Sequence, residues 1–442
     1  CSLTFFNMTT YALDFETYYD KECSIRTYGP RGYFAHPKFD AYMVSVVSDS
    51  GYEFCGHPED FDWSILEGQR VLSHNAFFDQ TLYIYGIGQG WWPEVKYAEW
   101  LCTADMAAYC GIPRSLKEAV KSVFQHDISK GTRDNMKGLD WKSMDPEFKK
   151  EVTEYALDDS RWCLKLWNAL QEKWPDFERW YSTHTRIICW RGIPVNESKI
   201  DANAVILRQA LWEAEQSIPW RDCGALLSRK EANKACRAAG ITPPLSWAMA
   251  DEECEKWMDE HADKFPWVYA VRNWRRINSL LKKVESFERG TYDGRYYGGL
   301  MYCGAHTKRF SGSGGNLNLQ NLPRGEMFGV DLRSQIEAAP GNTLVVVDLS
   351  QIEVRTLCWL AEDQETLEEI RKSDDIYEAF AVRFGLWDPA NGSLRENDKQ
   401  LRQTVKGMVL GCGYGASAKK YAMIMKCSLE DAERSVALYQ KK

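Results

Sequence analysis

The segment from Arg402 to Gly415, RQTVKGMVLGCGYG, places its large functional groups four residues apart. Arg402, Lys406, Leu410 and Tyr414 would share one face of a helix, because successive helical residues turn by about 100°. Two fixed cations, an apolar side chain and an aromatic ring would then line up over roughly 18 Å. A nucleoside triphosphate paired with a template base would match this order of charge and ring. A partly exposed surface helix would show the same pattern, and the segment alone favours neither.

Three pairs of polar residues nearer the N-terminus have the types and spacing of a metal site. Asp14 and Glu16 lie two residues apart in YALDFETY, so a strand would point both from one face of a sheet. The other two pairs are four residues apart: Asn75 with Asp79 in LSHNAFFD, and Tyr155 with Asp159 in EYALDDS. Taken singly, each pair is most often a helix cap, a surface pair or a satisfied polar group. Taken together, their carboxylates are the hard oxygen ligands that Mg²⁺ and Mn²⁺ prefer.

The hydrophobic pattern predicts the elements that would hold these residues. Residues 9–17 (TTYALDFET) and 42–47 (YMVSVV) are predicted strands, because they alternate and are rich in β-branched and aromatic side chains. From about 115 to 175 the pattern becomes helical. The mixture predicts an α/β first domain that covers residues 8–172.

Beyond this first domain, the pattern changes three more times. Helical segments broken by Gly and Pro come first. A β-rich piece follows from 293 to 350 and closes with TLVVVDLS, which is predicted to be a buried strand. The remainder is helical again, with a breaker cluster, WDPANGS, at 387–393. The predicted divisions are 173–290, 291–365 and 366–442.

The three polar pairs, in this order inside one α/β domain, resemble the motifs of the DEDD 3′–5′ exonuclease superfamily in its tyrosine subclass. The matching residues are Asp14, Glu16, Asp79 within NxxxD, and Tyr155 and Asp159 within YxxxD. The resemblance implies a ribonuclease H-like fold and a site for two Mg²⁺ or Mn²⁺ ions that hydrolyses a phosphodiester. Asp14 would bridge the ions. Glu16 and Asp159 would complete one ion site, and Asp79 would support the other. Tyr155 would orient the attacking water, and Asp158 lies one residue out of register.

A second resemblance concerns the segment VVVDLSQIEVR, which is similar to motif A of the family A DNA polymerases, relatives of bacterial DNA polymerase I. The resemblance implies that Asp348 binds the catalytic metal ions at a strand end, with Leu349 in place of the usual aromatic residue. It also implies that Glu353 helps to exclude the ribose 2′-hydroxyl group. Without the resemblance, an acid at a helix start that interacts with the helix dipole would be the simpler explanation of Glu353.

The segment that begins at Arg402 resembles the fingers motif of the same family, Rx₃Kx₃(F/Y)x₃YG. The resemblance implies that Arg402 and Lys406 bind phosphates and neutralise charge on the leaving pyrophosphate. Tyr414 would stack near the templating base, and Gly415 would let the helix bend. Leu410 stands where the family has Phe or Tyr, a ring that packs on the incoming sugar, so weaker sugar contact is expected.

Two further segments would hold the primer-template. HTKRFSGSGGNLNLQNLPRG resembles the family's TGRxSSxxPNLQNxP segment, which implies contacts on the minor-groove side of the DNA. A basic amphipathic helix predicted over 271–284 fits a thumb that contacts backbone phosphates. An ordinary solvated charged face would also explain this helix. The DNA-contacting residues expected in these segments are Arg309, Gln320, Asn321, Arg275 and Arg276.

The composition bounds the remaining possibilities. The net charge of −8 excludes a protein that is basic overall, so DNA would have to meet locally basic surfaces and metal-bridged contacts. The 14 cysteines include no CxxC pair, which indicates reduced thiols inside a cell. No apolar run is long enough for a membrane span, and the first residues lack the pattern of a signal peptide. The expected location is the cytoplasm of a bacterial or phage-infected cell.

Family A polymerases carry a third polymerase motif, His-Asp-Glu, and this sequence contains no such triplet. Two-metal nucleotidyl transfer needs a second carboxylate beside Asp348, so the chain is expected to be truncated at its C-terminus. The first expectation is template-directed DNA synthesis with 3′–5′ proofreading, acting on primer-template DNA, single-stranded 3′ ends and deoxynucleoside triphosphates. The alternative is a 3′–5′ exonuclease joined to a DNA-binding remnant that cannot polymerise, and a non-catalytic DNA-binding protein comes third. The sequence identifies no processivity partner.

Overall fold

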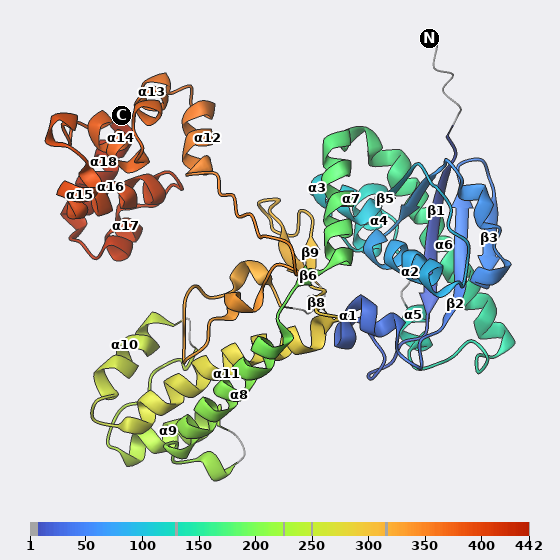
Figure 1. Ribbon diagram of the computed structural model, residues 1–442, viewed down its shortest axis with the longest axis horizontal. Helices are drawn as coiled ribbons and strands as arrows, with labels where there is room; N and C mark the ends of the chain where they lie inside the picture. The colour runs from blue at the N-terminus through green and yellow to red at the C-terminus, as the bar shows by residue number, and fades with distance from the viewer. Residues whose placement is uncertain (1–7, 129–130, 224–225, 249–250, 314–316, 442) are drawn as a thin grey trace. The chain divides into compact units, whose positions relative to one another are not determined.

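The predicted N-terminal strands lie in a five-stranded mixed sheet. The computed structural model describes residues 8–128, 131–223, 226–248, 251–313 and 317–441, and it divides the chain into two units that meet at Leu344 and Val345. The sheet belongs to the first unit and has the order β3-β2-β1-β4-β5, with β1 antiparallel to β2 and parallel to β4 (Figure 1). Its strands are β1 (Thr10–Thr17), β2 (Ala41–Ser48), β3 (Glu53–Gly56), β4 (Arg70–Ser73) and β5 (Glu99–Cys102). Both strands predicted from alternation are confirmed to within one residue at each end.

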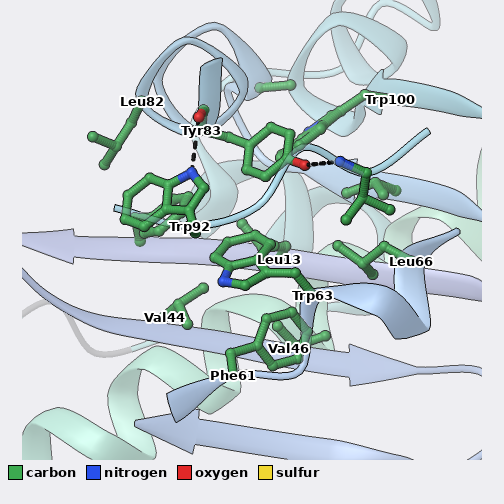
Figure 2. Close-up of a cluster of buried hydrophobic side chains, with 14 of the residues drawn as sticks. Leu13, Val44, Val46, Phe61, Trp63, Leu66, Leu82, Tyr83, Trp92 and Trp100 are labelled. Atoms are coloured by element: carbon green, nitrogen blue, oxygen red, sulfur yellow. Dashed lines mark hydrogen bonds between the residues drawn. The ribbon is translucent and has the colours of Figure 1, made fainter. Parts of the chain in front are cut away.

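An aromatic core covers one face of this sheet. Leu13 and Phe15 of β1 pack there with helices α1 (Ile25–Phe34) and α2 (Ala76–Gln89). Figure 2 shows Trp63 and Trp92 beside the strands, and Phe15 stacks on Trp92 with ring centroids 5.5 Å apart. Buried polar atoms in this core are paired: the Trp92 indole N–H donates to the Tyr83 carbonyl (2.8 Å), and the Tyr83 hydroxyl accepts from the Val95 N–H (2.9 Å). The core fixes β1 and α2, two of the elements that carry the polar pairs.

The long helix α6 (Pro146–Leu170) covers the other face. It packs with residues such as Ala12 and Leu72 of the sheet and with three smaller helices: α3 (Thr103–Tyr109), α4 (Leu116–Phe124) and α5 (Gly131–Met136). The start of α6 is set by Asp145, whose carboxylate caps the helix, and by Pro146 in the first turn. Since β1 side chains alternate between the two faces, the even-numbered residues of β1 point toward α6.

A mostly helical segment follows in the same unit. Its longest members, α8 and α11, lie side by side in Figure 1 and bury Leu207 against Leu280 and Val284. The basic helix predicted over 271–284 is confirmed as the middle of α11. The elements are α7 (Asp176–Arg191), α8 (Glu197–Gln216), α9 (Arg229–Ala238), α10 (Glu252–His261) and α11 (Pro266–Gly290).

Short strands make up the rest of the first unit. β6 (Ile193–Pro194), β7 (Thr291–Tyr292) and β8 (Arg295–Tyr296) form one small sheet, and β9 (Gly299–Met301) pairs with β10 (Ser311–Ser313). The prediction of a β-rich piece after residue 293 is therefore met only by short strands.

The prediction of a buried strand at TLVVVDLS is wrong in this structure. Residues 343–349 have no strand conformation, and the side chains of Val345, Val346 and Val347 are at least 80% exposed. A strand is stabilised by a neighbour that takes up its backbone hydrogen bonds. Within the described residues no strand pairs with this segment, so its apolar side chains have nothing to be buried against.

The second unit is helical. Its core includes Phe380 of α14 and Val405 and Met408 of α16, all buried. The predicted breaker WDPANGS forms a loop with a short 3₁₀ turn at Pro389–Asn391. The helices are α12 (Ile352–Leu360), α13 (Gln364–Lys372), α14 (Ile376–Arg383), α15 (Leu394–Asn397), α16 (Lys399–Cys412), α17 (Ala418–Met425) and α18 (Leu429–Lys441).

Two expectations from composition can be compared with the described residues. Each described cysteine is a free thiol, as the absence of CxxC pairs predicted. None of the described helices combines the length and the apolar character that a bilayer crossing requires.

Candidate active sites

The structure brings the acidic residues and the tyrosine predicted near the N-terminus into one open cavity of about 430 Å³. They come from three elements that are far apart in the sequence: β1, the first turn of α2, and the middle of α6. The predicted residues that line the cavity are Asp14, Glu16, Asn75, Asp79, Tyr155 and Asp159. The cavity is the candidate hydrolytic site.

β1 and α2 position the first three carboxylates. Asp14 and Glu16 alternate with Leu13 and Phe15, so the core residues pack on one face while the acids point toward α6. Asp79 is buried, and its Oδ1 accepts the N–H of Phe15 at 3.0 Å. This hydrogen bond fastens the first turn of α2 to the middle of β1, between the two acidic residues.

The register of α6 decides which of its acids reaches the cavity. The Ser45 hydroxyl on β2 donates to the Ala156 carbonyl (2.8 Å) and lies 2.7 Å from the Ser160 hydroxyl. These bonds set the rotation of α6, so Asp159 faces the cavity. Asp158 is turned away, is about half exposed, and pairs with Arg161 at 3.1 Å. The neighbour thought to be out of register therefore does not line the site.

Burial and mutual repulsion shift the titration of these groups. Surrounding protein desolvates Asp14 and raises its pKa well above the usual range, and three neighbouring carboxylates raise it further. Burial and repulsion from Asp159 raise the pKa of Glu16 to about 8. Burial also raises the pKa of Asp79 to about 8, although main-chain N–H groups partly offset the shift. Burial and the nearby Asp159 carboxylate raise the pKa of Tyr155. Without added cations, the cavity resists holding four negative charges at neutral pH.

The donor set fits divalent cations. Four carboxylates in one cavity supply hard oxygen ligands, and two divalent cations would balance their charge. Among the described residues, no three His, Cys, Asp or Glu side chains already meet as ligands of one ion.

Cations that the sequence reasoning did not single out line the same cavity: Arg26, Arg114, Lys117 and Arg133. Arg114 is already engaged, because it forms an ion pair with Asp105 and donates to the Tyr302 carbonyl at 2.8 Å. His74 also lines the cavity and contacts the Arg114 carbonyl at 2.7 Å. These residues have no periodic spacing. For Arg114, Lys117 and Arg133, a signal that could have found them is the density of charged residues between the NxxxD and YxxxD motifs.

In the second unit, α16 carries only part of the predicted row of side chains. Arg402, Lys406 and Leu410 lie on α16, but the helix ends at Cys412 and Tyr414 lies in the following turn. The expectation of four side chains along one helical face is therefore wrong at its last member. Gly415 has φ of +72°, a conformation that glycine adopts easily and that ends the helix. Tyr414 is 68% exposed.

Arg402 is not a free cation in this structure. Its Nε lies 2.5 Å from Asp375 Oδ2, its Nη2 lies 3.3 Å from Oδ1, and its guanidinium stands over the Tyr377 ring. Arg395 approaches the same carboxylate at 3.4 Å. The Asp375 pKa is lowered, since the bonds from Arg402 outweigh the effect of burial. The two-point contact holds the guanidinium in one orientation.

Asp375→Asn tests the strength of this contact. Asn still caps α14 but loses the charge, so we expect the free energy of local opening of α14 and α16 to fall by about 1–3 kcal/mol. Hydrogen exchange of the amides in both helices measures this free energy. The matched control is Asp363→Asn, which changes a cap of the same kind on α13 and should leave α14 and α16 unchanged. Equal protection in Asp375→Asn and the unaltered chain would contradict the prediction.

Glu353 and Tyr414 line one cavity of about 380 Å³ in the second unit. The other walls are mostly apolar and include Leu357, Leu360 and Val409. Glu353 also lies in the first turn of α12, where an acid is favoured by the helix dipole. Both explanations of Glu353 therefore stay compatible with its position. Lys406 and Leu410 do not line this cavity.

The residues predicted to contact DNA have more varied surroundings. Arg309, Gln320 and Asn321 are exposed, and the Asn321 carbonyl accepts from Lys283 at 3.4 Å. Residues 314–316 of the same predicted segment lie outside the described residues. Asp348 is exposed in the unpaired segment 343–349.

The cations of α11 already have partners. Arg276 pairs with Glu255 of α10 at 2.9 Å, and Arg275 donates to the Trp247 carbonyl with its guanidinium over the Trp247 ring. Burial lowers the pKa of Arg275. DNA contact through either side chain stays a prediction, and it would require these partners to be exchanged for phosphates.

Comparison with known proteins places the chain in a family. The sequence model of DNA polymerase family A matches residues 246–442. DNA polymerase I of Aquifex aeolicus is 30% identical over 186 residues, which cover 40% of this chain and 30% of that protein. Thermostable DNA polymerase I of Thermus filiformis is 32% identical over 307 residues, which cover 66% of this chain and 36% of that protein. The chain thus spans about a third of the length of these two relatives.

A solved structure has a similar fold. It is described as the POL domain of Pol1 from M. smegmatis in complex with DNA primer-template and dNTP. The TM-score is 0.66 at 17% sequence identity, and the match covers 98% of this chain and 72% of the other. At this identity the likeness concerns the fold alone. The sequence matches place residues 246–442 of the chain in DNA polymerase family A.

Proposed function

We propose that the protein carries out template-directed DNA synthesis and removes nucleotides from 3′ ends by hydrolysis. The observation that carries the hydrolytic part is the meeting of Asp14, Glu16, Asp79, Tyr155 and Asp159 in one cavity. Membership of DNA polymerase family A supports the synthetic part. The proposed domains are a ribonuclease H-like exonuclease (8–172), a thumb with connecting helices (173–290), a partial palm (291–365) and fingers (366–442).

The proposed hydrolytic site works through its carboxylates. Asp14, Glu16, Asp79 and Asp159 would hold two Mg²⁺ or Mn²⁺ ions. When bound, the ions supply Lewis acidity and a nucleophile at neutral pH. Tyr155 lines the cavity with Asp159. Burial and the Asp159 charge raise the Tyr155 pKa, and the Tyr155 hydroxyl would orient an attacking water. Asp79 keeps its place through the Phe15 N–H, which leaves its other oxygen for an ion.

The proposed polymerase site draws on the second unit. Arg402 and Lys406 would bind the triphosphate, and Arg402 would do so with the edge that Asp375 leaves open. Tyr414 would stack near the templating base and Glu353 would lie on the sugar side, since both line one cavity. Asp348 would hold the metal ions of synthesis. Leu410 would leave the sugar contact weaker than a ring does.

The proposed partners are primer-template DNA, single-stranded 3′ ends and deoxynucleoside triphosphates. Arg309, Gln320 and Asn321 would lie along the minor groove of the primer-template, whose acceptors are nearly independent of sequence. Arg275 and Arg276 would contact backbone phosphates. Binding through these residues is expected to weaken with salt and to be insensitive to sequence.

One gel tests the proposal. A labelled primer on a longer template is incubated with the protein and Mg²⁺, with and without the four deoxynucleoside triphosphates. Extension with nucleotides and shortening without them would support both activities. Shortening in both lanes would support hydrolysis and contradict synthesis by this chain. An unchanged primer in both lanes would contradict the whole proposal.

A further inference from the structure

Three of the four cations around the candidate hydrolytic cavity, Arg26, Lys117 and Arg133, form no ion pair within the described residues. Arg114 is engaged by Asp105, and of the other three we consider Arg133, because its charge acts on both Asp14 and Glu16. Arg133 lies on an exposed position of α5, a six-residue helix between the second and third acidic motifs that buries Thr132 and Met136. A cation that lines an acidic cavity without joining an ion pair is available for an anionic ligand.

Three hydrogen bonds hold α5 against the cavity. The Tyr19 hydroxyl donates to the Arg133 carbonyl (2.6 Å), and the Tyr19 carbonyl accepts from the N–H of Gly138 (2.9 Å). The Thr132 hydroxyl donates to Glu151 of α6 (2.6 Å). Tyr19 follows β1 and also lines the cavity. The backbone that carries Arg133 is thus fixed to the two elements that carry most of the acidic residues.

The electrostatic coupling agrees with this placement. The positive charge of Arg133 opposes the increases in the pKa of Asp14 and of Glu16. Burial opposes the charge of Arg133, but Tyr155, Glu16 and Asp14 outweigh it and raise the pKa of Arg133. The guanidinium therefore lies near enough to act on the reaction site, although its side chain is exposed.

We propose that Arg133 binds a backbone phosphate of the single strand whose 3′ end enters the cavity. A guanidinium offers two parallel N–H groups to phosphate oxygens, and an exposed one can exchange water for phosphate at low cost. The strand is a polyanion approaching four carboxylates, so a fixed cation on the same cavity offsets part of the repulsion. This inference rests on the proposed hydrolytic function and names the contact that would bring the strand to it.

The test measures binding of a single-stranded tetranucleotide of thymidylate to the full chain in Ca²⁺. Ca²⁺ accepts the same oxygen ligands in looser geometry than Mg²⁺, which favours binding over hydrolysis. Arg133→Gln is expected to bind about tenfold more weakly, as for loss of one charge-assisted hydrogen bond. The matched control is Lys137→Gln, an exposed cation in the same segment that does not line the cavity, and it should bind as the unaltered chain does.

Neutral linkages locate the contact. Three tetranucleotides, each with one methylphosphonate, remove the charge of one phosphate at a time. If Arg133 binds one phosphate, one of the three methylphosphonates should weaken tetranucleotide binding by the unaltered chain about tenfold. The same methylphosphonate should leave binding by Arg133→Gln unchanged. Equal losses in both proteins at every linkage would overturn the inference, as would unchanged binding by Arg133→Gln.

Two further readings separate this inference from the function on which it rests. Tyr19→Phe keeps the ring but loses the bond to the Arg133 carbonyl, so a smaller loss of binding is expected. One possible result is that one methylphosphonate linkage weakens binding only when Arg133 is present, while the unaltered chain does not shorten DNA in Mg²⁺. This result would support the phosphate contact and contradict the hydrolytic function. If the unaltered chain shortens DNA but no linkage depends on Arg133, the hydrolytic function would be supported and the contact between Arg133 and a phosphate would be overturned.

Discussion

Asp14→Ala is expected to abolish shortening of DNA 3′ ends, with a loss of about 1,000-fold or more in rate. Asp14 is buried in the cavity, and after burial the nearby Asp79, Glu16 and Asp159 carboxylates raise its pKa further. Its removal would take a shared ligand from both proposed ion sites. The substitution also removes a desolvated carboxylate, so the fold should not lose stability through unpaired charge.

The measurement is the initial rate of shortening of a labelled single strand in Mg²⁺, with primer-template binding measured in parallel. Binding should not change, since Asp14 lines the hydrolytic cavity and none of the residues proposed to contact primer-template DNA does. The control is Asp158→Ala, which alters an adjacent acid that pairs with Arg161 and does not line the cavity. Shortening at an equal rate by Asp14→Ala would rule out the exonuclease assignment.

Asp348→Ala is expected to have the reverse effect: primer extension is lost, by about 1,000-fold or more, and shortening is kept. Asp348 is the proposed ion ligand for synthesis and lies in segment 343–349, outside the hydrolytic cavity. The measurement is the extension rate of a labelled primer with the four deoxynucleoside triphosphates.

The two substitutions serve as controls for each other. Asp14→Ala should still extend the primer, and Asp348→Ala should still shorten a single strand. If either substitution reduced both activities alike, the assignment of two separate sites would be wrong. Thermal unfolding of both variants would show whether a joint loss came from misfolding.

Two strands of the N-terminal sheet could be predicted because their signal is local. The alternation in β1 reports directly that Leu13 and Phe15 face a core while Asp14 and Glu16 do not. The four-residue spacing of Tyr155 and Asp159 likewise places them on one face of α6. The resemblance to known motifs then selected Asp159 over Asp158, a choice that the register of α6 agrees with.

Features that depend on a distant partner could not be predicted. The apolar run at 343–350 has the composition of a buried strand, yet burial depends on a neighbour that local sequence does not specify. The cations of α11 have the pattern of a solvated or DNA-binding face. Arg272 and Arg276 instead pair with Glu255 on another helix. Arg133 was missed because its backbone is positioned by a hydrogen bond from the distant Tyr19 hydroxyl. A periodic sequence pattern does not reveal such a contact.

The row of side chains from Arg402 to Tyr414 shows a limit of periodic reasoning. A spacing of four residues implies one helical face only while the helix continues. Helix α16 ends at Cys412, and Gly413 follows it directly. Gly415 adopts a left-handed backbone conformation, so Tyr414 lies in a turn between these two glycines. The glycines were visible in the sequence, but the residue at which the helix stops was not.

The bond between Asp79 and the Phe15 N–H bears on how this site can vary through mutation. The donor is main chain, so every residue except proline at position 15 can supply it. The Phe15 side chain belongs to the aromatic core, where it stacks on Trp92. A substitution at this position would therefore change core packing without removing the N–H donor. Strand β1 therefore divides two roles between neighbouring residues: Leu13 and Phe15 pack in the aromatic core, whereas Asp14 and Glu16 line the cavity.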